Sequence, residues 1–322
     1  MNTRAGARVG ASLLAVACLV SACMPGLPRQ GTPATATYRV PTDIRFRLAR
    51  RDFLLHVPPL RLPAAPRALV VVLHGAFSTA RQTEEETGFS ALADQEGFLV
   101  AYPEGIGILG WLQHWNAGHC CGKAAEDDWD DVGFVAEVIR AVQQRFDIDP
   151  QRVFLAGMSN GGMLAYRFAA EHSEQVAAIA VVAGAIGSSR GDGAEPWRLP
   201  EPRTPLPVLA VHGTDDGHIP YEGGTSPIKG GDQAYLSVAE AMRFWRENNG
   251  CTPETHTESR RGGMLERTSC RTCEGNNPVV LYTLRGWAHD WPAPHFTDRR
   301  PEGDPLRGLD MTKVLWDFFQ NP

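Results

Sequence analysis

Short runs of consecutive apolar residues recur along the chain, and segments with apolar residues at helical spacing lie between them. Runs of this kind are typical of strands that are buried on both faces of a sheet. We predict such strands at 68–73, 98–102, 153–156, 177–183, 208–212 and 279–284. We predict helices at 87–96, 130–146, 163–170, 233–249 and 311–319. Strands that alternate with helices indicate an α/β fold with a mostly parallel central sheet and helices on both faces.

The remaining segments define the expected extent of the domain. We expect an N-terminal hairpin from strands at 44–48 and 52–57, and a long loop at 105–122. Residues 184–207 are rich in Gly, Pro and Arg, so they leave no room for a large helical lid. No internal repeat and no shift in composition marks a second domain. We therefore expect residues 42–322 to form a single folded domain.

The N-terminus has the features of an export signal. Arg4 and Arg8 accompany the apolar stretch 9–20, which is too short to span a bilayer comfortably. The sequence Val-Ser-Ala-Cys at 20–23 resembles a bacterial lipobox, in which cleavage precedes the cysteine and the cysteine is lipidated. An ordinary secretory signal cut nearby is the alternative. We expect a lipoprotein signal peptide at 1–22, a flexible tether rich in Pro, Thr and Ala at 23–41, and membrane contact only through Cys23.

Composition and charge narrow the class of protein. The chain is 43% hydrophobic and 21% charged, as globular proteins are. Its formal net charge of −6 argues against nucleic acid as the main partner. Export would favour disulfides among the five cysteines that follow Cys23, and a bridge from Cys251 to either Cys270 or Cys273 would close the segment 252–269. A zinc site that joins these cysteines to the pair at 120–121 is disfavoured, because the spacing is not that of a zinc ribbon.

The most informative stretch is Gly-Met-Ser-Asn-Gly at 157–161. It follows a predicted strand and opens a predicted helix, which is the context of the nucleophile elbow of α/β-hydrolases. Glycines on both sides of Ser159 allow a sharp, strained turn that exposes the serine above the sheet. We therefore predict that Ser159 is a nucleophile and that the N–H of Asn160 faces an oxyanion formed beside it.

A second oxyanion donor is expected before the elbow. The strand predicted at 68–73 ends in His74-Gly75-Ala76-Phe77, and a Gly-containing loop at this place supplies the second donor of α/β-hydrolases. We assign this donor to the backbone of Ala76. His74 lies at a strand end before the nucleophile, so we expect a structural role for it and not that of the base.

A serine nucleophile needs a base within hydrogen-bond reach and an acid that orients the base. In α/β-hydrolases both follow the serine, acid before histidine, on loops after sheet strands. The strand at 208–212 leads to Asp215 or Asp216, and the strand at 279–284 leads to His289, which we predict as the base. His218 shares the loop of the acid, and His295 follows no strand directly and is the reserve candidate. His256 lies in the cysteine-flanked segment.

Several short stretches now carry a more specific resemblance. They are GMSNGG at 157–162, HGTDD at 212–216 with PY at 220–221, HDWP at 289–292, WNAG at 115–118, CCG at 120–122 and DDVGF at 130–134. Together they resemble the polyhydroxybutyrate depolymerase/feruloyl esterase-like family of α/β-hydrolases, from about residue 39 to the C-terminus. The resemblance implies that the acid is Asp216 and that Asp215 is a loop residue. Where the family usually has a glycine cluster before the histidine, this chain has Gly286-Trp287-Ala288.

The implied activity is that of a secreted or membrane-tethered serine carboxylic ester hydrolase that forms an acyl-enzyme, with no metal and no organic cofactor. The expected partner is a small ester or oligoester, and the sequence ranks feruloyl and hydroxybutyrate esters equally. We assign Trp115, Trp287 and Trp291 to substrate binding. These residues, like Trp111, could stack on an aromatic acyl group, and packing is the alternative role. A serine peptidase of the same fold and a non-catalytic ligand-binding relative are the alternatives.

Overall fold

The computed structural model describes residues 34–41, 50–59, 66–108, 111–191, 194–228, 231–270 and 272–322. The predicted signal peptide, Cys23 and the strand predicted at 44–48 lie outside these residues. Among the described helices, none combines the length and the apolar character needed to cross a membrane.

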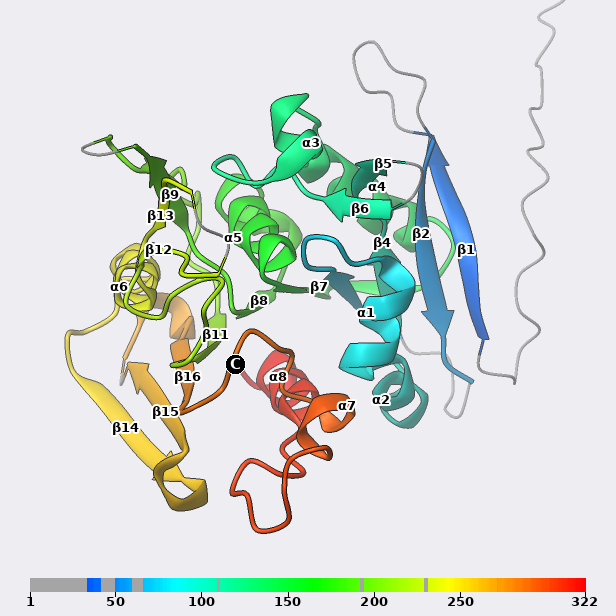
Figure 1. Cartoon of the computed structure of the whole chain (residues 1–322). Helices are drawn as coiled ribbons and strands as arrows, with labels where there is room; N and C mark the ends of the chain where they lie inside the picture. The colour runs from blue at the N-terminus through cyan, green and yellow to red at the C-terminus, as the bar shows by residue number, and fades with distance from the viewer. Residues whose placement is uncertain are drawn as a thin grey trace, which may run out of the picture.

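A ten-stranded sheet forms the centre of the molecule, in the order β1-β2-β4-β3-β7-β8-β11-β16-β15-β14 (Figure 1). Its strands are β1 (Ala34–Pro41), β2 (Arg50–Val57), β3 (Arg67–Leu73), β4 (Leu99–Pro103), β7 (Ile148–Met158), β8 (Ala178–Val182), β11 (Val208–Gly213), β14 (Thr255–Arg260), β15 (Leu265–Cys270) and β16 (Val279–Leu284). The strands from β4 to β16 in this order run parallel, and an antiparallel hairpin extends each edge. The mostly parallel α/β sheet predicted from the sequence is confirmed.

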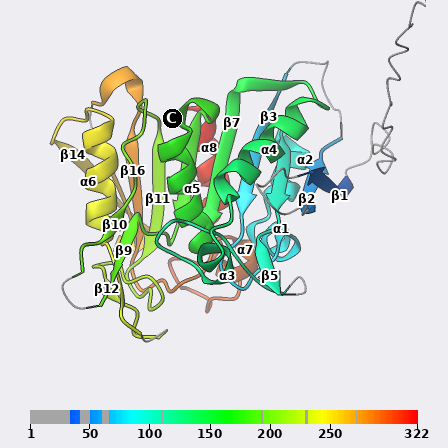
Figure 2. The ribbon, with the colours of Figure 1, turned by 90° about the horizontal axis from the view of Figure 1, so that it is seen from above.

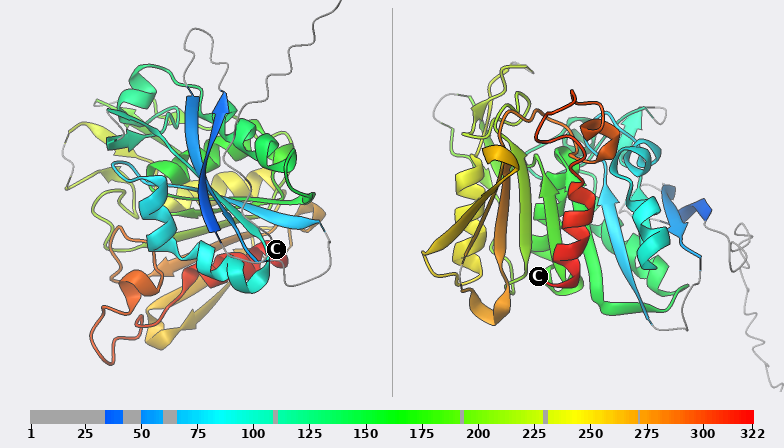
Figure 3. Two further views of the ribbon diagram at one scale, coloured as in Figure 1. Left: turned by 90° about the vertical axis from the view of Figure 1, so that its right-hand side faces the viewer. Right: turned by 90° about the horizontal axis from the view of Figure 1, so that it is seen from below.

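Helices cover both faces of the sheet, as Figures 2 and 3 show. The helices α4 (Asp131–Gln143), α5 (Asn160–Glu171) and α6 (Val238–Asn248) pack on one face. The helices α1 (Ala80–Thr87), α2 (Phe89–Glu96) and α8 (Met311–Gln320) pack on the other. Strand β3 explains the need for both layers: Leu69, Val71 and Leu73 join the first core, while the residues that alternate with them join the second.

The shorter elements lie in the connections. They are β5 (Ile106–Ile108), β6 (Trp111–His114), α3 (Gly122–Glu126), β9 (Gly187–Arg190), β10 (Trp197–Arg198), β12 (Gly224–Thr225), β13 (Gln233–Tyr235), α7 (Pro294–Thr297) and the 3-10 turns Ser173–Gln175, Arg261–Gly263 and Glu274–Asn276. Within the described part of 184–207, the regular structure consists of β9 and β10 only. This agrees with the absence of a large lid in the predicted fold.

The structure corrects several predicted boundaries. Ala34–Pro41, expected within the tether, is strand β1, because it pairs along its whole length with β2. The helix predicted at 87–96 is two helices, since Gly88 adopts a left-handed conformation (φ 71°) that ends α1. The helix predicted at 233–249 begins only at Val238, after a capping box formed by Ser237 and Glu240.

The cysteine-flanked segment is an edge hairpin. Its strands β14 and β15 extend the sheet beside β16. A disulfide joins Cys251 to Cys273, one of the two pairings expected, and Cys270 is a free, buried thiol. Cys120 and Cys121 are also bonded to each other.

Candidate active site

The predicted nucleophile lies at the junction of β7 and α5. Ser159 has φ 53° and ψ −121°, a strained conformation for a residue with a side chain. The turn is possible because α5 starts very close to β3: a Cβ on Gly161 would lie 2.3 Å from the carbonyl oxygen of His74. Local sequence therefore produces the elbow, and any larger residue at 161 would displace the helix.

The two predicted oxyanion donors face no other protein acceptor. Among the described residues, the N–H groups of Ala76 and Asn160 make no hydrogen bond. The next amide along the chain, that of Phe77, donates to Gln113 O at 2.8 Å. Ala76 and Asn160 thus retain the free N–H groups that an oxyanion requires.

The predicted acid is fixed from several sides. Asp216 follows β11, and its side chain is buried. Oδ1 accepts the backbone N–H groups of His218 and Ile219 at 2.8 and 2.9 Å, and Oδ2 lies 2.7 Å from Nδ1 of His289. Nε2 of His212 donates to Ile219 O at 2.8 Å and lies 3.3 Å from the same Oδ2. Asp215, by contrast, is exposed and accepts only from Thr214 among these loop residues.

These contacts control the charge of the acid. Burial by itself raises the pKa of Asp216, but hydrogen bonds from His212 and His289 outweigh it and hold the pKa well below its usual value. Asp216 is therefore ionised in the folded protein at neutral pH. His212 is a contact of the acid that the sequence reasoning did not assign, although it lies in the HGTDD stretch already singled out.

The predicted base follows β16. The loops after β11 and β16 meet closely, because a Cβ on Gly213 would lie 2.1 Å from Trp287 O. His289 is 13% exposed and lines the same cavity as Ser159. Among the described residues, no hydrogen bond joins its ring to Ser159. His218 stacks on His289 with 4.8 Å between ring centroids, whereas the reserve candidate His295 is exposed on α7 and pairs with Arg299.

A cavity of about 320 Å³ opens beside Ser159 and His289. The aromatic residues on its wall are Phe77, Trp291 and Phe296. The polar ones are Ser78, Gln82, Thr83, Glu86, Thr87 and Asp290. The described lining contains two carboxyl groups and no Lys or Arg, and burial raises the pKa of Glu86. The cavity thus offers apolar area and hydrogen-bond acceptors, but no cation for an anionic substrate group.

The three tryptophans assigned to substrate binding have different environments. Trp291 lines the cavity. Trp287 does not: its Nε1 donates to Asp290 O, and the guanidinium of Arg300 lies over its ring. Trp115 is completely buried. The substrate-binding assignments of Trp115 and Trp287 are therefore corrected, because packing and hydrogen bonds keep both rings out of the cavity. For Trp111, only the backbone position, at the start of β6, is described.

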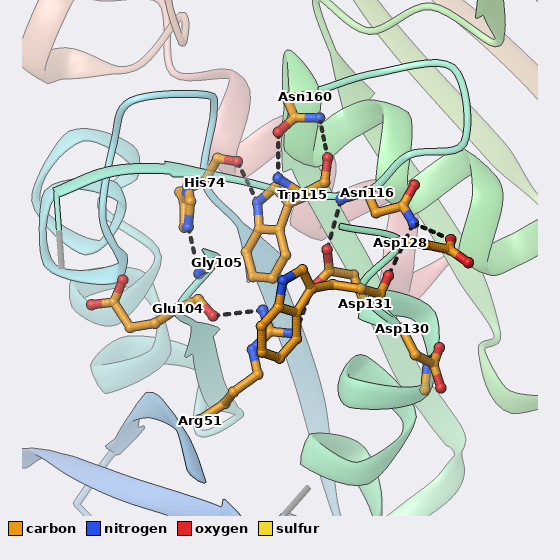
Figure 4. Close-up of polar contacts among 12 residues, drawn as sticks. Arg51, His74, Glu104, Gly105, Trp115, Asn116, Asp128, Asp130, Asp131 and Asn160 are labelled. Atoms are coloured by element: carbon orange, nitrogen blue, oxygen red, sulfur yellow. Dashed lines mark hydrogen bonds and ion pairs between the residues drawn. The ribbon is translucent and has the colours of Figure 1, made fainter. Parts of the chain in front are cut away.

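His74 is a structural residue in this geometry. Its Nδ1 donates to Gly75 O at 2.7 Å, and its Nε2 accepts the N–H of Gly105 at 2.9 Å (Figure 4). Burial lowers the pKa of His74 to about 4. A neutral ring with both nitrogens engaged cannot act as the base.

Two groups of described side chains bring possible metal ligands within 4.8 Å of one another. They are Asp216, His218 and His289, and the three cysteines 251, 270 and 273. In the first group the Asp216–His289 hydrogen bond occupies two of the donors, and in the second a disulfide does. A metal would have to break one of these bonds, so neither group is an open site.

Comparison with known proteins identifies the family. The profile of the family described as Esterase PHB depolymerase matches residues 52–192. NocK of Nocardia uniformis subsp. tsuyamanensis, a protein named as an esterase, is 31% identical over 84% of this chain and 79% of its own length. Feruloyl esterase B of Piromyces equi is 30% identical over 78% of this chain, which spans only 42% of that longer protein.

Solved structures support the fold. An acetyl xylan esterase from Aspergillus awamori superposes with a TM-score of 0.54 at 16% identity, over 88% of this chain and 99% of that chain. A ferulic acid esterase from Anaeromyces mucronatus gives 0.54 at 11% identity, over 90% of each. The esterase names of the two sequence relatives, NocK and feruloyl esterase B, favour ester hydrolysis over the peptidase and ligand-binding alternatives. The chain belongs to the polyhydroxybutyrate depolymerase/feruloyl esterase-like family of the α/β-hydrolase superfamily and is a carboxylic ester hydrolase.

Proposed function

We propose that the enzyme cleaves esters through an acyl-enzyme on Ser159, with His289 as general base and Asp216 as the acid that orients it. The observation that carries this proposal is that His289, which lines the same cavity as Ser159, forms a 2.7 Å hydrogen bond with the buried carboxylate of Asp216. A serine on a strained elbow, a histidine and a buried carboxylate are the three parts of such a mechanism.

The steps follow from these positions. His289 takes the proton of Ser159 as its oxygen attacks the ester carbonyl, and the N–H groups of Ala76 and Asn160 stabilise the resulting oxyanion. Each such donor contributes about 3 kcal/mol in comparable sites. His289 then gives its proton to the leaving alcohol, and afterwards activates the water that releases the acid from Ser159. Ser159 and His289 form their hydrogen bond only when substrate binds, because contacts of this kind are often long or poorly aligned in the free enzyme.

The cavity favours a neutral aromatic ester as substrate. Phe77, Trp291 and Phe296 offer faces and edges to an aromatic acyl group. Glu86 and Asp290 can accept hydrogen bonds from hydroxyl groups, but they repel the terminal carboxylate of a hydroxybutyrate oligomer. The feruloyl esterase names of several relatives agree with this choice. We therefore propose feruloyl-type esters ahead of hydroxyalkanoate oligomers.

We further propose that the enzyme works outside the cytoplasm, held at the membrane by lipid on Cys23 or released after cleavage of a secretory signal. The basic and apolar N-terminal pattern supports export. Metabolic labelling with a fatty acid would separate the two cases, because only the lipidated form incorporates the label and loses it in Cys23→Ser.

The decisive experiment compares initial hydrolysis rates of methyl ferulate and a 3-hydroxybutyrate trimer, with Ser159→Ala as the control. We expect faster cleavage of methyl ferulate and no cleavage of either ester by Ser159→Ala. Preferred cleavage of the trimer would contradict the substrate choice alone. Activity that survives in Ser159→Ala would overturn the assignment of the nucleophile.

A further inference from the structure

The two proposed oxyanion donors come from different parts of the fold. Ala76 lies on the loop after β3, and Asn160 is the first residue of α5. An oxyanion hole works only if both N–H groups keep a fixed separation, so something must tie the loop to the helix. The contacts of Trp115, which lies after β6, supply this tie.

Trp115 is bonded to both parts, as Figure 4 shows. Its backbone N–H donates to Oδ1 of Asn160 at 2.7 Å, and its carbonyl accepts from Nδ2 of Asn160 at 3.0 Å. Its indole Nε1 donates to the carbonyl oxygen of His74 at 2.9 Å, and the two rings pack with centroids 4.6 Å apart. His74 directly precedes the Gly75–Ala76 peptide, so the indole fixes the start of the loop that carries the first donor.

A buried ion pair in turn holds the segment of Trp115. The N–H of Asn116 donates to Oδ2 of Asp131 at 2.6 Å, and Oδ1 of Asp131 pairs with the guanidinium of Arg51. The guanidinium also donates to Glu104 O at 2.9 Å and lies over the Trp115 ring, 5.5 Å from its centroid. Both members of the pair are almost fully buried. Removing either partner of such a pair would leave an uncompensated buried charge, so the pair holds the segment in one place.

We propose that Trp115 is a positioning residue that sets the relative placement of the Ala76 and Asn160 donors, and that the Arg51–Asp131 pair holds Trp115 in place. The inference rests on the proposed oxyanion hole and deepens it. It gives a role to two stretches that no step of the mechanism uses, WNAG at 115–118 and DDVGF at 130–134, and to Arg51 on β2.

Trp245 shows that packing alone does not account for these contacts. Trp245 is as completely buried as Trp115 and stacks on Tyr166, yet among the described residues its Nε1 has no hydrogen-bond partner. The indole N–H of Trp115 is instead matched to one carbonyl beside the active site. Trp245 lies on α6, away from the cavity at Ser159, and is therefore a matched control.

The test replaces each tryptophan by phenylalanine and measures kcat and KM for a soluble aryl ester, together with the melting temperature. We expect Trp115→Phe to lower kcat by about tenfold to a hundredfold with little change in KM, because a displaced donor affects mainly the transition state. The inhibition constant of an aryl trifluoromethyl ketone, which forms a tetrahedral oxyanion on serine, should rise by the same factor. Trp245→Phe should leave kcat and this inhibition constant unchanged.

An equal change in kcat for the two variants, or a loss in Trp115→Phe with unchanged inhibition by the ketone, would overturn the proposal. If Trp115→Phe does not fold, 3-benzothienylalanine at position 115 replaces only the N–H by sulfur, and the same comparison applies. Ser159→Ala distinguishes failure of the proposed function from failure of the positioning role. Activity in that variant contradicts the proposed function, whereas an inactive Ser159→Ala with a fully active Trp115→Phe contradicts only the positioning role.

Discussion

Replacing Asp216 by asparagine tests the proposed acid with a side chain of nearly the same shape. Two backbone N–H groups, those of His218 and Ile219, converge on Oδ1. The oxygen of the new amide must stay at this position, because the NH₂ group would face two donors there. The amide nitrogen therefore takes the place of Oδ2 and faces Nδ1 of His289, 2.7 Å from the present oxygen.

The consequence is the wrong tautomer of the base. An N–H donor facing Nδ1 stabilises the neutral ring that carries its proton on Nε2, and this ring cannot take the proton of Ser159. In serine hydrolases the corresponding change lowers kcat by about 10⁴. At about 1.4 kcal/mol for each tenfold change, this is about 5.5 kcal/mol of barrier. The same variant also loses the charge that stabilises protonated His289 in the transition state.

The assay measures kcat for a soluble aryl ester near neutral pH, with the melting temperature as a check on folding. Asp215→Asn is the control, because it removes the same charge from the neighbouring, exposed position. We expect it to retain nearly full activity. A folded Asp216→Asn that loses less than about tenfold, or an equal loss in Asp215→Asn, would refute the role of Asp216.

Three further predictions follow from the same contacts. Replacing both Cys251 and Cys273 by serine should lower the free energy of unfolding by about 3 kcal/mol, because the bridge closes a loop with a sequence separation of 22. An unchanged midpoint of chemical denaturation would contradict this. Burial lowers the pKa of His74 to about 4, from about 6.5 in the unfolded chain, so the neutral ring stabilises the fold fully above about pH 6.5. Denaturant titrations should show about 3 kcal/mol of this free energy lost as the pH falls toward 4, and a flat pH profile would contradict the prediction. Glu86→Gln should lower KM for a carboxylate-ended hydroxybutyrate trimer about threefold or more, and it should change KM for methyl ferulate little, because the amide oxygen of Gln still accepts a hydrogen bond. Glu85→Gln, at an exposed neighbouring position, should change neither KM, and equal effects of the two variants would argue against repulsion inside the cavity.

The parts of the site that local sequence dictates were predictable. The elbow needs small residues because α5 approaches β3 so closely that Gly161 has no room for a Cβ. This requirement leaves a recognisable pattern in five consecutive residues. The loops after β11 and β16 were predictable for a related reason, since both follow runs of apolar residues that can only be buried strands. Steric requirements of this kind therefore leave a pattern that can be read locally.

Contacts between distant residues were not predictable in this way. Arg51 and Asp131 are 80 positions apart, and charged residues are usually exposed, so nothing local marks them as a buried pair. Trp115 was assigned to the substrate because an aromatic residue in a long loop has the same local pattern whether its ring faces a ligand or the core. Strand β1 was assigned to the tether because its strand structure depends on pairing with β2 and not on composition.

The order of strands in the sheet explains why one half of the proposed triad is already assembled. β11 and β16 are neighbours, so the loops that carry Asp216 and His289 meet directly and form a short hydrogen bond without substrate. Ser159 follows β7, which β8 separates from β11, and among the described residues it makes no hydrogen bond to His289. β3 is the other neighbour of β7, so the elbow is built together with the Ala76 loop. The fold thus forms two groups of residues, the proposed acid–base pair and the proposed nucleophile with its oxyanion donors, and we expect an ester that binds between them to complete the contact between Ser159 and His289.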